Sequence, residues 1–312
     1  MESEAMLEAV REGGMLPGGT PVVAMLSGGR DSVCLLDLAV RLLGADPVTA
    51  LHVNYGLRDD SDADEQHCAA LCARLGVRFE AERPRRPEGP GNLQAWARDA
   101  RYAAAARLAE ADGSLIATGH TADDQVETIL YRLASSPSRR ALLGMKPRDG
   151  VLVRPLLGFS RERTTAYCEQ RGLAWRDDPS NAGAAYARNR VRHGLAAALA
   201  EVHPAAARNV LRTAELLRDE AEVLDALVAA ELDDSNGSAR NTIELERLAE
   251  LPPALRRLVV QQLADRAAGR PVAGAARHAE EVAALRRTGT AMLDLGGGVR
   301  AIAERGTLRA ER

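Results

Sequence analysis

Residues 21–43, PVVAMLSGGRDSVCLLDLAVRLL, predict a strand, a glycine turn and a helix in immediate succession. The apolar run at 21–26 suits a short buried strand, and it ends at the Ser-Gly-Gly turn 27–29. Apolar residues then recur at helical spacing over 33–43. This order is typical of the first unit of an α/β sheet, in which the glycine turn follows the carboxyl end of the first strand.

The same alternation continues as far as about residue 205. Short apolar runs predict further strands at 48–53, 76–80 and 114–118. Helical patterns follow these or lie between them, at 59–75, 93–111 and 121–134. Strands that alternate with helices through short loops predict an α/β fold with a doubly wound, Rossmann-like parallel sheet.

The character of the chain changes after residue 205. A long helical stretch covers 206–232, and helical patterns dominate as far as Arg287. The last part, AMLDLGGGVRAIAERGTLRA at 291–310, predicts a β-hairpin that turns at its three consecutive glycines. We therefore expect two domains, with the doubly wound domain at 1–205 and a smaller, mostly helical domain at 206–312 that ends in the hairpin.

The composition is that of an ordinary globular protein, with 312 residues, 46% hydrophobic and 27% charged residues, and a net charge of −3. Any nucleic-acid surface must be local, because the chain as a whole carries no basic excess. Four cysteines are too few and too scattered for a disulfide framework. The N-terminus lacks the pattern of a secretory signal, and no apolar run approaches the ~20 residues of a membrane span. We expect a cytoplasmic protein without membrane contact.

The turn SGGRDS at 27–32 has the chemistry of a phosphate-binding loop. Gly28 and Gly29 let backbone N–H groups approach an anion, the two serine hydroxyls add donors, and the N-terminus of the following helix favours negative charge. Asp31 is a candidate ligand for the Mg²⁺ that accompanies ATP. The turn is neither GxGxxG nor a Walker loop, since the one lysine of the chain is Lys146. A lone Ser-Gly-Gly is equally an ordinary turn, but its place after the first strand favours the phosphate site.

A second polar segment, GHTADDQVET at 119–128, follows the fourth predicted strand. Its three acids lie within about one helical turn, at Asp123, Asp124 and Glu127. His120 is expected at the same edge of the sheet as the glycine turn. Acids at a helix start also serve as ordinary helix-capping residues. Beside an ATP loop, however, clustered acids favour the binding of magnesium or of a cationic amino acid.

The stretch SGGRDS resembles the SGGxDS fingerprint of the PP-loop ATP pyrophosphatases, which stands intact here. The resemblance implies that ATP is cleaved between its α and β phosphates. A substrate oxygen becomes adenylylated as pyrophosphate leaves, and a nucleophile then displaces AMP. Catalysis of such a transfer consists mainly of positioning and charge neutralisation.

Over nearly the whole chain, the order of motifs resembles that of the tRNA(Ile)-lysidine synthases. The motifs are SGGRDS (27–32), HVNYGLR (52–58), ARDARY (97–102), GHTADDQVET (119–128), VRPLL (153–157) and DPSNAGAAYARNRVR (178–192). The family adenylylates C2 of the wobble cytidine in a CAU-anticodon tRNA(Ile) and then attaches free L-lysine, which yields lysidine, AMP and pyrophosphate. The resemblance implies a ligase that requires ATP and Mg²⁺, with this tRNA and L-lysine as partners, and a homodimer as in many relatives.

The resemblance also implies roles for single residues. Asp124 and Glu127 are expected to recognise the lysine ammonium, and His52 and Arg98 are expected near the ATP phosphates. The candidate catalytic residues are Asp31, His120, Asp123, Asp124 and Glu127, with Asp31 also the metal ligand. The candidate nucleotide-binding residues are Ser27, Gly28, Gly29, Arg30, Asp31, Ser32, His52 and Arg98.

Contact with RNA is expected from local positive charge. Residues 131–165 contain eight basic and two acidic residues, and a second basic stripe lies beside Tyr186. Solvated arginines are the common reading of such stretches, but the neighbouring ATP site favours contact with the tRNA backbone. The candidate substrate-binding residues are Asp124, Glu127, Arg188, Asn189 and Arg192. The domain at 206–312 is expected to grip or select the tRNA.

Two departures from the family pattern affect the site. The family commonly has histidine where Tyr55 stands. The segment 134–145, ASSPSRRALLGM, lacks the usual Gly-rich turn and keeps only Leu-Gly-Met at its end. The contacts of both places with substrate are therefore open.

Three other functions remain as alternatives. A tRNA thiolase of the same fold predicts CxxC pairs, which the sequence lacks. An amidotransferase-type ligase that acts on a small acid predicts ATP turnover without RNA. A non-catalytic RNA-binding module predicts that pyrophosphate is never released, although the intact loop and acids speak against it.

Overall fold

The computed structural model describes residues 2–87, 91–135, 139–176, 187–232 and 241–312, with the main chain alone at 140 and 188. The chain divides into two compact units, Met1–Glu215 and Leu216–Arg312. This division falls inside helix α10 (Ala206–Leu232), whereas the expected boundary lies at the start of that helix. The domain assignment with its boundary at 205/206 stays a prediction.

The first unit contains a six-stranded sheet in the order β3-β2-β1-β4-β6-β5. The strands are β1 (Val22–Met25), β2 (Val48–Val53), β3 (Arg78–Glu82), β4 (Leu115–Ala117), β5 (Arg148–Asp149) and β6 (Leu152–Val153). All neighbours are parallel except β5 and β6, which are antiparallel. The doubly wound parallel sheet is confirmed.

The strand order reverses beside β1, which pairs with β2 on one side and with β4 on the other. In such sheets the crevice outside the carboxyl ends of the strands, at the point of reversal, is where ligands bind. The predicted loop 27–32 follows β1, and the acidic segment 119–128 follows β4. The topology therefore places both segments at the same edge.

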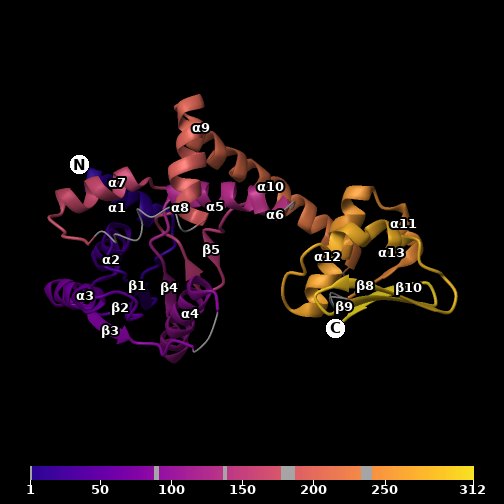
Figure 1. Cartoon of the computed structure of the whole chain (residues 1–312), viewed down its shortest axis with the longest axis horizontal. Coiled ribbons are helices and arrows are strands. Elements are labelled where there is room, and N and C mark those ends of the chain that lie inside the picture. Colours follow the sequence, from indigo (N-terminus) through magenta and orange to yellow (C-terminus); the bar gives the residue numbers. More distant parts are fainter. Residues whose placement is uncertain (1, 88–90, 136–138, 177–186, 233–240) are drawn as a thin grey trace. The chain divides into compact units, whose positions relative to one another are not determined.

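Helices cover both faces of this sheet (Figure 1). The helices that share a core with the sheet are α1 (Glu2–Glu12), α2 (Arg30–Leu43), α3 (Ser61–Leu75), α4 (Leu93–Asp112) and α7 (Arg161–Gln170). The unit also contains α5 (Ala122–Ser135) and α6 (Arg139–Leu142). Neighbouring residues of a strand point to opposite faces. Val22 and Ala24 of β1 accordingly join the core with α1, α2, α3 and α7, whereas Val23 and Met25 join the core with α4.

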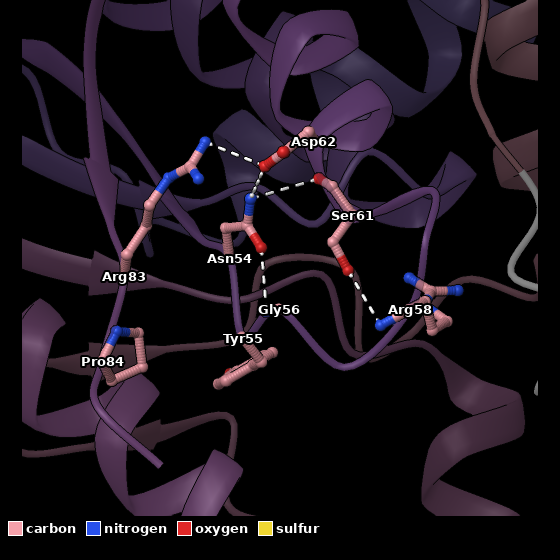
Figure 2. A pocket seen from close by; sticks show the side chains of 8 residues that line it. All are labelled: Asn54, Tyr55, Gly56, Arg58, Ser61, Asp62, Arg83 and Pro84. Carbon is pink, nitrogen blue, oxygen red and sulfur yellow. Dashed lines mark hydrogen bonds and ion pairs between the residues drawn. The ribbon is translucent and has the colours of Figure 1, made fainter.

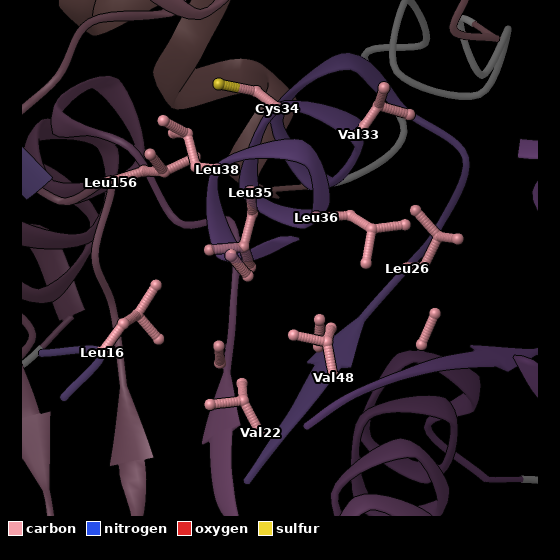
Figure 3. Close-up of a cluster of buried hydrophobic side chains, with 14 of the residues drawn as sticks. Leu16, Val22, Leu26, Val33, Cys34, Leu35, Leu36, Leu38, Val48 and Leu156 are labelled. Atoms are coloured by element: carbon pink, nitrogen blue, oxygen red, sulfur yellow. The ribbon is translucent and has the colours of Figure 1, made fainter. Parts of the chain in front are cut away.

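Helix α2 is anchored by its apolar side. Leu35, Leu36 and Leu38 have no exposed surface, and Figure 3 shows them in one cluster with the strand residues Val22 and Val48. Full burial of each leucine stabilises the fold by about 1.5–3 kcal/mol. The first turn of α2, which follows the glycine loop directly, is therefore held in a fixed position against the sheet.

Three short helical segments follow in the first unit, namely α8 (Ala187–Arg190), the π-helical η2 (Val191–Ala196) and α9 (Ala197–Val202). Val191 packs with Val126 and Leu130 of α5 in a small core. A π-helical turn is rare and is often found at functional sites. This packing brings the basic segment after Tyr186 against the helix that carries the predicted acids.

The second unit contains a four-stranded antiparallel sheet in the order β7-β10-β9-β8. Its strands are β7 (Thr242–Glu244), β8 (Thr290–Gly296), β9 (Val299–Glu304) and β10 (Thr307–Glu311). Its helices are α11 (Leu245–Glu250), α12 (Pro253–Ala268), η3 (Ala275–His278) and α13 (Ala279–Ala283). The expected hairpin is confirmed as β8–β9, whose turn uses the positive φ angles of Gly297 and Gly298. It is part of this larger sheet.

None of the helices in the described ranges combines the length and the apolar character that a bilayer crossing requires.

Candidate active site

The loop 27–32 leaves the end of β1 and turns sharply into α2. Gly28 has φ +85°, and a Cβ there would lie 3.2 Å from Sγ of Cys68, so both conformation and space require glycine. The first intrahelical hydrogen bond of α2 runs from the Val33 N–H to the Gly29 carbonyl. The N–H groups of Arg30 and Asp31 precede this bond, and they are the donors that a helix N-terminus offers to an anion.

The two serines hold this loop in shape. The Ser32 hydroxyl donates to the Gly29 carbonyl at 2.7 Å, and the Ser27 N–H donates to Ser32 Oγ at 3.2 Å. The two hydroxyl oxygens lie 3.1 Å apart. These bonds within the loop fix its shape, so its backbone donors need little rearrangement to meet a phosphate.

Gly119 brings the end of β4 against this loop. A Cβ at Gly119 would lie 2.8 Å from the Asp31 carbonyl oxygen and 3.1 Å from the Ser32 nitrogen. No side chain fits there unless the backbone moves. His120 follows directly and is hydrogen-bonded through Nδ1 to the Thr118 hydroxyl at 2.8 Å. The structure thus confirms that the two predicted motifs meet at one edge of the sheet.

Asp31 points from the loop toward α7. Its Oδ1 accepts a hydrogen bond from the Thr164 hydroxyl at 2.5 Å, and its Oδ2 lies 3.9 Å from Arg161 Nε. Burial raises the pKa of Asp31 above its ordinary value, and Thr164 and Arg30 offset only part of this effect. Burial disfavours the charged form of this carboxylate, and a cation bound beside it would favour that form again.

Asp124 and Glu127 are both buried on α5, where they form ion pairs with two arginines. The Arg161 guanidinium reaches Asp124 Oδ1 at 2.5 Å and Glu127 Oε1 at 2.9 Å. Arg192, from η2, reaches Glu127 Oε1 at 2.6 Å. The other Asp124 oxygen accepts the Thr121 N–H at 2.9 Å, which caps the start of α5. We call Asp124, Glu127, Arg161 and Arg192 the acid–arginine group.

The acid–arginine group keeps the Glu127 carboxylate charged. Burial alone would raise the pKa of Glu127, but hydrogen bonds from Arg192 and Arg161 outweigh it and hold the pKa below the ordinary value. Burial would lower the pKa of Arg161, but Asp124 and Glu127 raise it. Counted alone, the two carboxylates and the two guanidiniums of the group balance, while Asp31 and Asp123 lie beside Arg161 and add negative charge.

Sequence reasoning missed the role of Arg161. It was counted among the basic residues of 131–165 that were expected to face RNA, yet its side chain is only 19% exposed and contacts the acids of α5. The pairing joins residues 34 and 37 positions apart on different helices. Local sequence patterns do not reveal such a contact. The available signal was the position of Arg161 at the start of the polar helix that follows VRPLL.

Asp123 lies beside the acid–arginine group and caps helix α7. Its Oδ2 accepts the backbone N–H of Arg161 at 2.8 Å, at the first residue of α7. This is the helix-capping role of an acid. The structure therefore gives Asp123 a positioning contact, and its catalytic role stays a prediction.

His52 and Arg98 differ in their contacts. His52 is buried, and its Nδ1 lies 2.9 Å from the carbonyl of Leu26, the residue before the loop. Arg98 is exposed on α4, with its Cζ 4.7 Å from the centre of the Tyr102 ring. Within the described ranges, no hydrogen bond or ion pair joins Arg98 to residues 27–32.

The structure describes only part of the basic segment near residue 190. Arg192 belongs to the acid–arginine group, and Asn189 is buried on α8. The side chain of Arg188, and all of 177–186, lie outside the described residues. Their predicted contacts with substrate stay predictions.

The end of β2 opens into a pocket of about 370 Å³ (Figure 2). Buried Asn54 lines this pocket, and its side-chain amide donates to Asp62 at 3.0 Å and to Glu65 at 2.8 Å. Tyr55, where the family commonly has histidine, donates its hydroxyl to the Ala97 carbonyl at 2.9 Å and stacks edge-on against Trp96. This tyrosine ties β2 to α4, which gives the first departure from the family pattern a structural contact.

Gln125 binds the Leu-Gly-Met end of the segment 134–145, which is the second departure from the family pattern. Its amide accepts the Met145 N–H at 2.6 Å and donates to the Met145 carbonyl at 2.9 Å. A Cβ at Gly144 would lie 2.6 Å from this amide, and Gly144 has φ +66°. Arg132 adds a bond to the Gly144 carbonyl at 2.7 Å. The Leu-Gly-Met end of 134–145 is thus fixed to α5.

The residues at the loop fit a magnesium ion that phosphates help to hold. In the described part of the chain, no three His, Cys, Asp or Glu side chains converge as a metal-binding group. Mg²⁺ needs only one or two carboxylates where phosphates and water complete its shell. Asp31, with a partly exposed carboxylate at the start of α2, meets that requirement.

A family model described as the PP-loop domain matches residues 6–199. The match covers the whole sheet of the first unit, the loop 27–32 and the acid–arginine group. It therefore includes every described residue of the site.

The sequence is also similar to curated tRNA(Ile)-lysidine synthases. The Thermus thermophilus protein is 39% identical over 258 residues, which are 81% of this chain and 50% of that protein. The Solibacter usitatus protein is 37% identical over 264 residues, 82% of this chain and 59% of that protein. The Burkholderia pseudomallei protein is 36% identical over 279 residues, with shares of 87% and 57%. The chain spans about half the length of the curated relatives it matches.

Among solved structures, the chain resembles the U34-tRNA thiolase NcsA from Methanococcus maripaludis, which was solved with its 4Fe-4S cluster. The TM-score is 0.57 at 18% identity, over 69% of this chain and 78% of that chain. At this identity the likeness shows a shared fold.

Proposed function

The chain belongs to the PP-loop domain family, and from this premise we propose that it is an ATP-dependent ligase that attaches free L-lysine to C2 of the wobble cytidine in a CAU-anticodon tRNA(Ile). The curated relatives, which are named for this product, share 36–39% of their residues with it. Because the chain spans about half of their length, the proposal for its activity, substrates and partners is argued from the geometry of the site.

One observation carries the proposal: a glycine loop held in shape by its own hydrogen bonds and a buried acid pair lie on the same edge of one sheet. The loop follows β1, the acids follow β4, and Gly119 holds the two segments in backbone contact. Adenylyl transfer needs the first feature, and recognition of an alkyl ammonium needs the second. Neither feature alone distinguishes a lysine ligase from other PP-loop enzymes.

The reaction divides into two displacements. In the first, the C2 oxygen of cytidine attacks the α-phosphorus of ATP, the bond to the β-phosphate breaks, and pyrophosphate leaves. The N–H groups of Arg30 and Asp31 are the donors that would hold the departing charge, in a loop that its two serines keep in shape. Bound Mg²⁺ neutralises phosphate charge, and Asp31 is the residue that would hold it.

In the second displacement, the lysine ε-amino group attacks C2, the C2–O bond breaks, and AMP leaves. The ammonium must lose a proton before it attacks. His120, an imidazole at the end of β4 hydrogen-bonded to Thr118, is the candidate acceptor. AMP is a good leaving group, whereas the unactivated oxygen is a poor one, and this difference is the reason for the first step.

Lysine entry requires a change in the acid–arginine group. Arg161 contacts both acids, whereas Arg192 is the more exposed arginine and comes from the segment after Tyr186. We therefore infer that the lysine ammonium replaces Arg192 at Glu127, while Arg161 stays. The exchange keeps the charge of the group balanced.

The proposal is tested by incubating the protein with ATP, magnesium, labelled lysine and a CAU-anticodon tRNA(Ile) transcript. We expect one lysine in each RNA, with equal amounts of AMP and pyrophosphate, and none with a transcript that carries GAU instead. RNA free of lysine, under conditions in which ATP is cleaved, would overturn it.

The thiolase alternative finds no support in the site. Cys34, Cys68, Cys72 and Cys168 are all buried free thiols, and the described residues contain no three-ligand group for a cluster. Burial raises the pKa of Cys68 and of Cys72 to about 12, so neither is a thiolate at neutral pH.

Three further parts of the proposal have tests of their own. The domain at 206–312 is proposed to grip or select the tRNA, which its deletion would show as a loss of discrimination between transcripts. A homodimer is proposed, and light scattering at micromolar concentration measures it. A cytoplasmic location is proposed, and fractionation of cells that express the whole protein decides it.

A further inference from the structure

Four arginines of the first unit lie near one another around Tyr102, two of them over its ring and the others linked to these by charge. Arg98 and Arg101 lie on α4, Arg132 lies on α5, and Arg154 directly follows β6. The Cζ atoms of Arg98 and Arg101 lie 4.7 and 5.6 Å from the centre of the ring. We call the four residues the arginine cluster.

The charges of the arginine cluster act on one another. Burial lowers the pKa of Arg132, and the charges of Arg98 and Arg154 lower it further. Burial also lowers the pKa of Arg154, an effect that Tyr102 and Asp149 partly offset and that Arg98 reinforces. The cluster is therefore a local excess of positive charge that Tyr102 and Asp149 relieve only in part.

No carboxylate in the described ranges forms an ion pair with a member of the arginine cluster. The two inner arginines donate to main-chain carbonyls instead. Arg132 donates to Gly144 at 2.7 Å, and Arg154 donates to Lys146 at 2.6 Å. These bonds fix the guanidinium groups in place but leave their charge uncompensated, unlike the neutral acid–arginine group.

The cluster also contains buried donors without acceptors. Arg154 is 6% exposed, and its Nε has no hydrogen-bond partner. Arg101 Nε is likewise buried and without a hydrogen-bond partner. Buried polar groups are normally satisfied, and an exception calls for a missing ligand or a functional reason.

We propose that the arginine cluster is a second phosphate-binding site, separate from the loop 27–32, which takes a phosphate group of the RNA backbone or of pyrophosphate. A phosphate offers several acceptor oxygens in the geometry that guanidinium forks match, and it supplies the negative charge that the cluster lacks. The identification of RNA as one source rests on the proposed function, whereas the anion site rests on the cluster alone.

The position of the arginine cluster favours a role distinct from that of the ATP loop. Helix α4 packs on the opposite face of the sheet from α2, whose N-terminus carries the loop. Arg154 follows the end of β6, which neighbours β4 at the same carboxyl edge. A phosphate held here would flank a nucleotide whose base lies at that edge.

The variants Arg98→Gln, Arg101→Gln and Arg154→Gln test the proposal, with Arg74→Gln on the exposed side of α3 as the control. Binding of a labelled CAU-anticodon tRNA(Ile) transcript is measured by fluorescence anisotropy without ATP or lysine, at salt concentrations of about 50–200 mM. Each cluster variant should bind the RNA about tenfold more weakly, and the slope of log Kd against log salt should fall by about 1. The control should match the wild type.

A parallel titration with inorganic pyrophosphate separates the two sources of phosphate. If the cluster holds pyrophosphate, the midpoint of its protection against thermal unfolding should shift about tenfold in the same variants, while RNA binding stays unchanged. Unchanged RNA and pyrophosphate binding in all three folded variants would overturn the proposal.

Two controls keep the outcome interpretable. If Arg154→Gln does not fold, the double variant of the more exposed Arg98 and Arg101 decides alone. The wild-type assay of lysine transfer is run separately. If the wild type transfers no lysine but the cluster variants bind phosphate more weakly, the proposed function is rejected and the arginine cluster stays a phosphate site. If lysine is transferred but the variants bind RNA and pyrophosphate as the wild type does, the cluster alone is rejected.

Discussion

Replacement of Glu127 by glutamine removes the most buried charge of the acid–arginine group. The Glu127 side chain is 3% exposed and accepts hydrogen bonds from Arg161 at 2.9 Å and from Arg192 at 2.6 Å. Loss of one partner from a fully buried pair costs about 3–5 kcal/mol. Both arginines are partly exposed, and Arg161 keeps Asp124, so we expect the free energy of unfolding at pH 7 to fall by about 2–3 kcal/mol.

The pH dependence of this loss has a definite sign. Although burial alone would raise the pKa of Glu127, hydrogen bonds from Arg192 and Arg161 hold it below the ordinary value in the folded protein. The stabilisation is therefore complete above the pKa of an unfolded glutamate and is lost as the pH falls through the lower folded pKa. The difference between wild type and variant should stay constant from about pH 6 to 8 and shrink below about pH 4.

Tryptophan fluorescence during urea unfolding measures this prediction in the right unit. The two tryptophans of the chain, Trp96 and Trp175, both lie in Met1–Glu215, so the signal follows that unit and not the second one. Glu110→Gln, an exposed site on α4, is the control and should change stability by less than about 0.5 kcal/mol. Equal stabilities of wild type and Glu127→Gln at pH 7, or a difference undiminished at about pH 3, would refute the reasoning.

Four further substitutions test the site. Asp31→Ala should reduce pyrophosphate release ~100-fold or more and leave the unfolding curve near that of wild type, because it removes the carboxylate assigned to the metal and phosphates; normal release would contradict that role. Gly119→Ala should lower the melting temperature by several degrees, since its Cβ would lie 2.8 Å from the Asp31 carbonyl oxygen; calorimetry that shows no change would mean that the two motifs are not in contact. Asp124→Asn should raise the KM for lysine about tenfold or more, with a smaller effect on the KM for ATP, as steady-state kinetics can show; equal effects on both would remove Asp124 from the lysine pocket. Arg192→Gln, assayed at saturating tRNA, should lower the KM for lysine several-fold because a competing cation is gone; an increase would show that Arg192 helps lysine to bind.

Much of the first unit could be predicted because local signals agree with the tertiary fold. The predicted strand 48–53 is β2. The predicted helix 93–111 is α4, which Asn92 caps through bonds to the N–H groups of Gln94 and Ala95 and which Gly113 ends in the left-handed conformation. Caps and glycines act over a few residues, so a sequence displays them directly.

The remainder depends on contacts between distant residues. Helix α1 was not predicted, although Met6, Leu7 and Val10 are buried in the main core. The pairing of β7 with β10 joins segments more than 60 residues apart. Arg161 and Arg163 are nearly adjacent in sequence, yet one contacts the buried acids and the other contacts Glu2. Charge alone does not tell which side of a helix faces the core.

The contact between Gln125 and Met145 places part of the sheet edge under the control of a helix. One buried amide satisfies both main-chain groups of Met145 and leaves room only for glycine at 144. The chain that follows leads to β6 and Arg154, so its starting position is set by a side chain of α5. Loss of this one amide would therefore disturb the edge of the sheet near Arg154 as well as α5 itself.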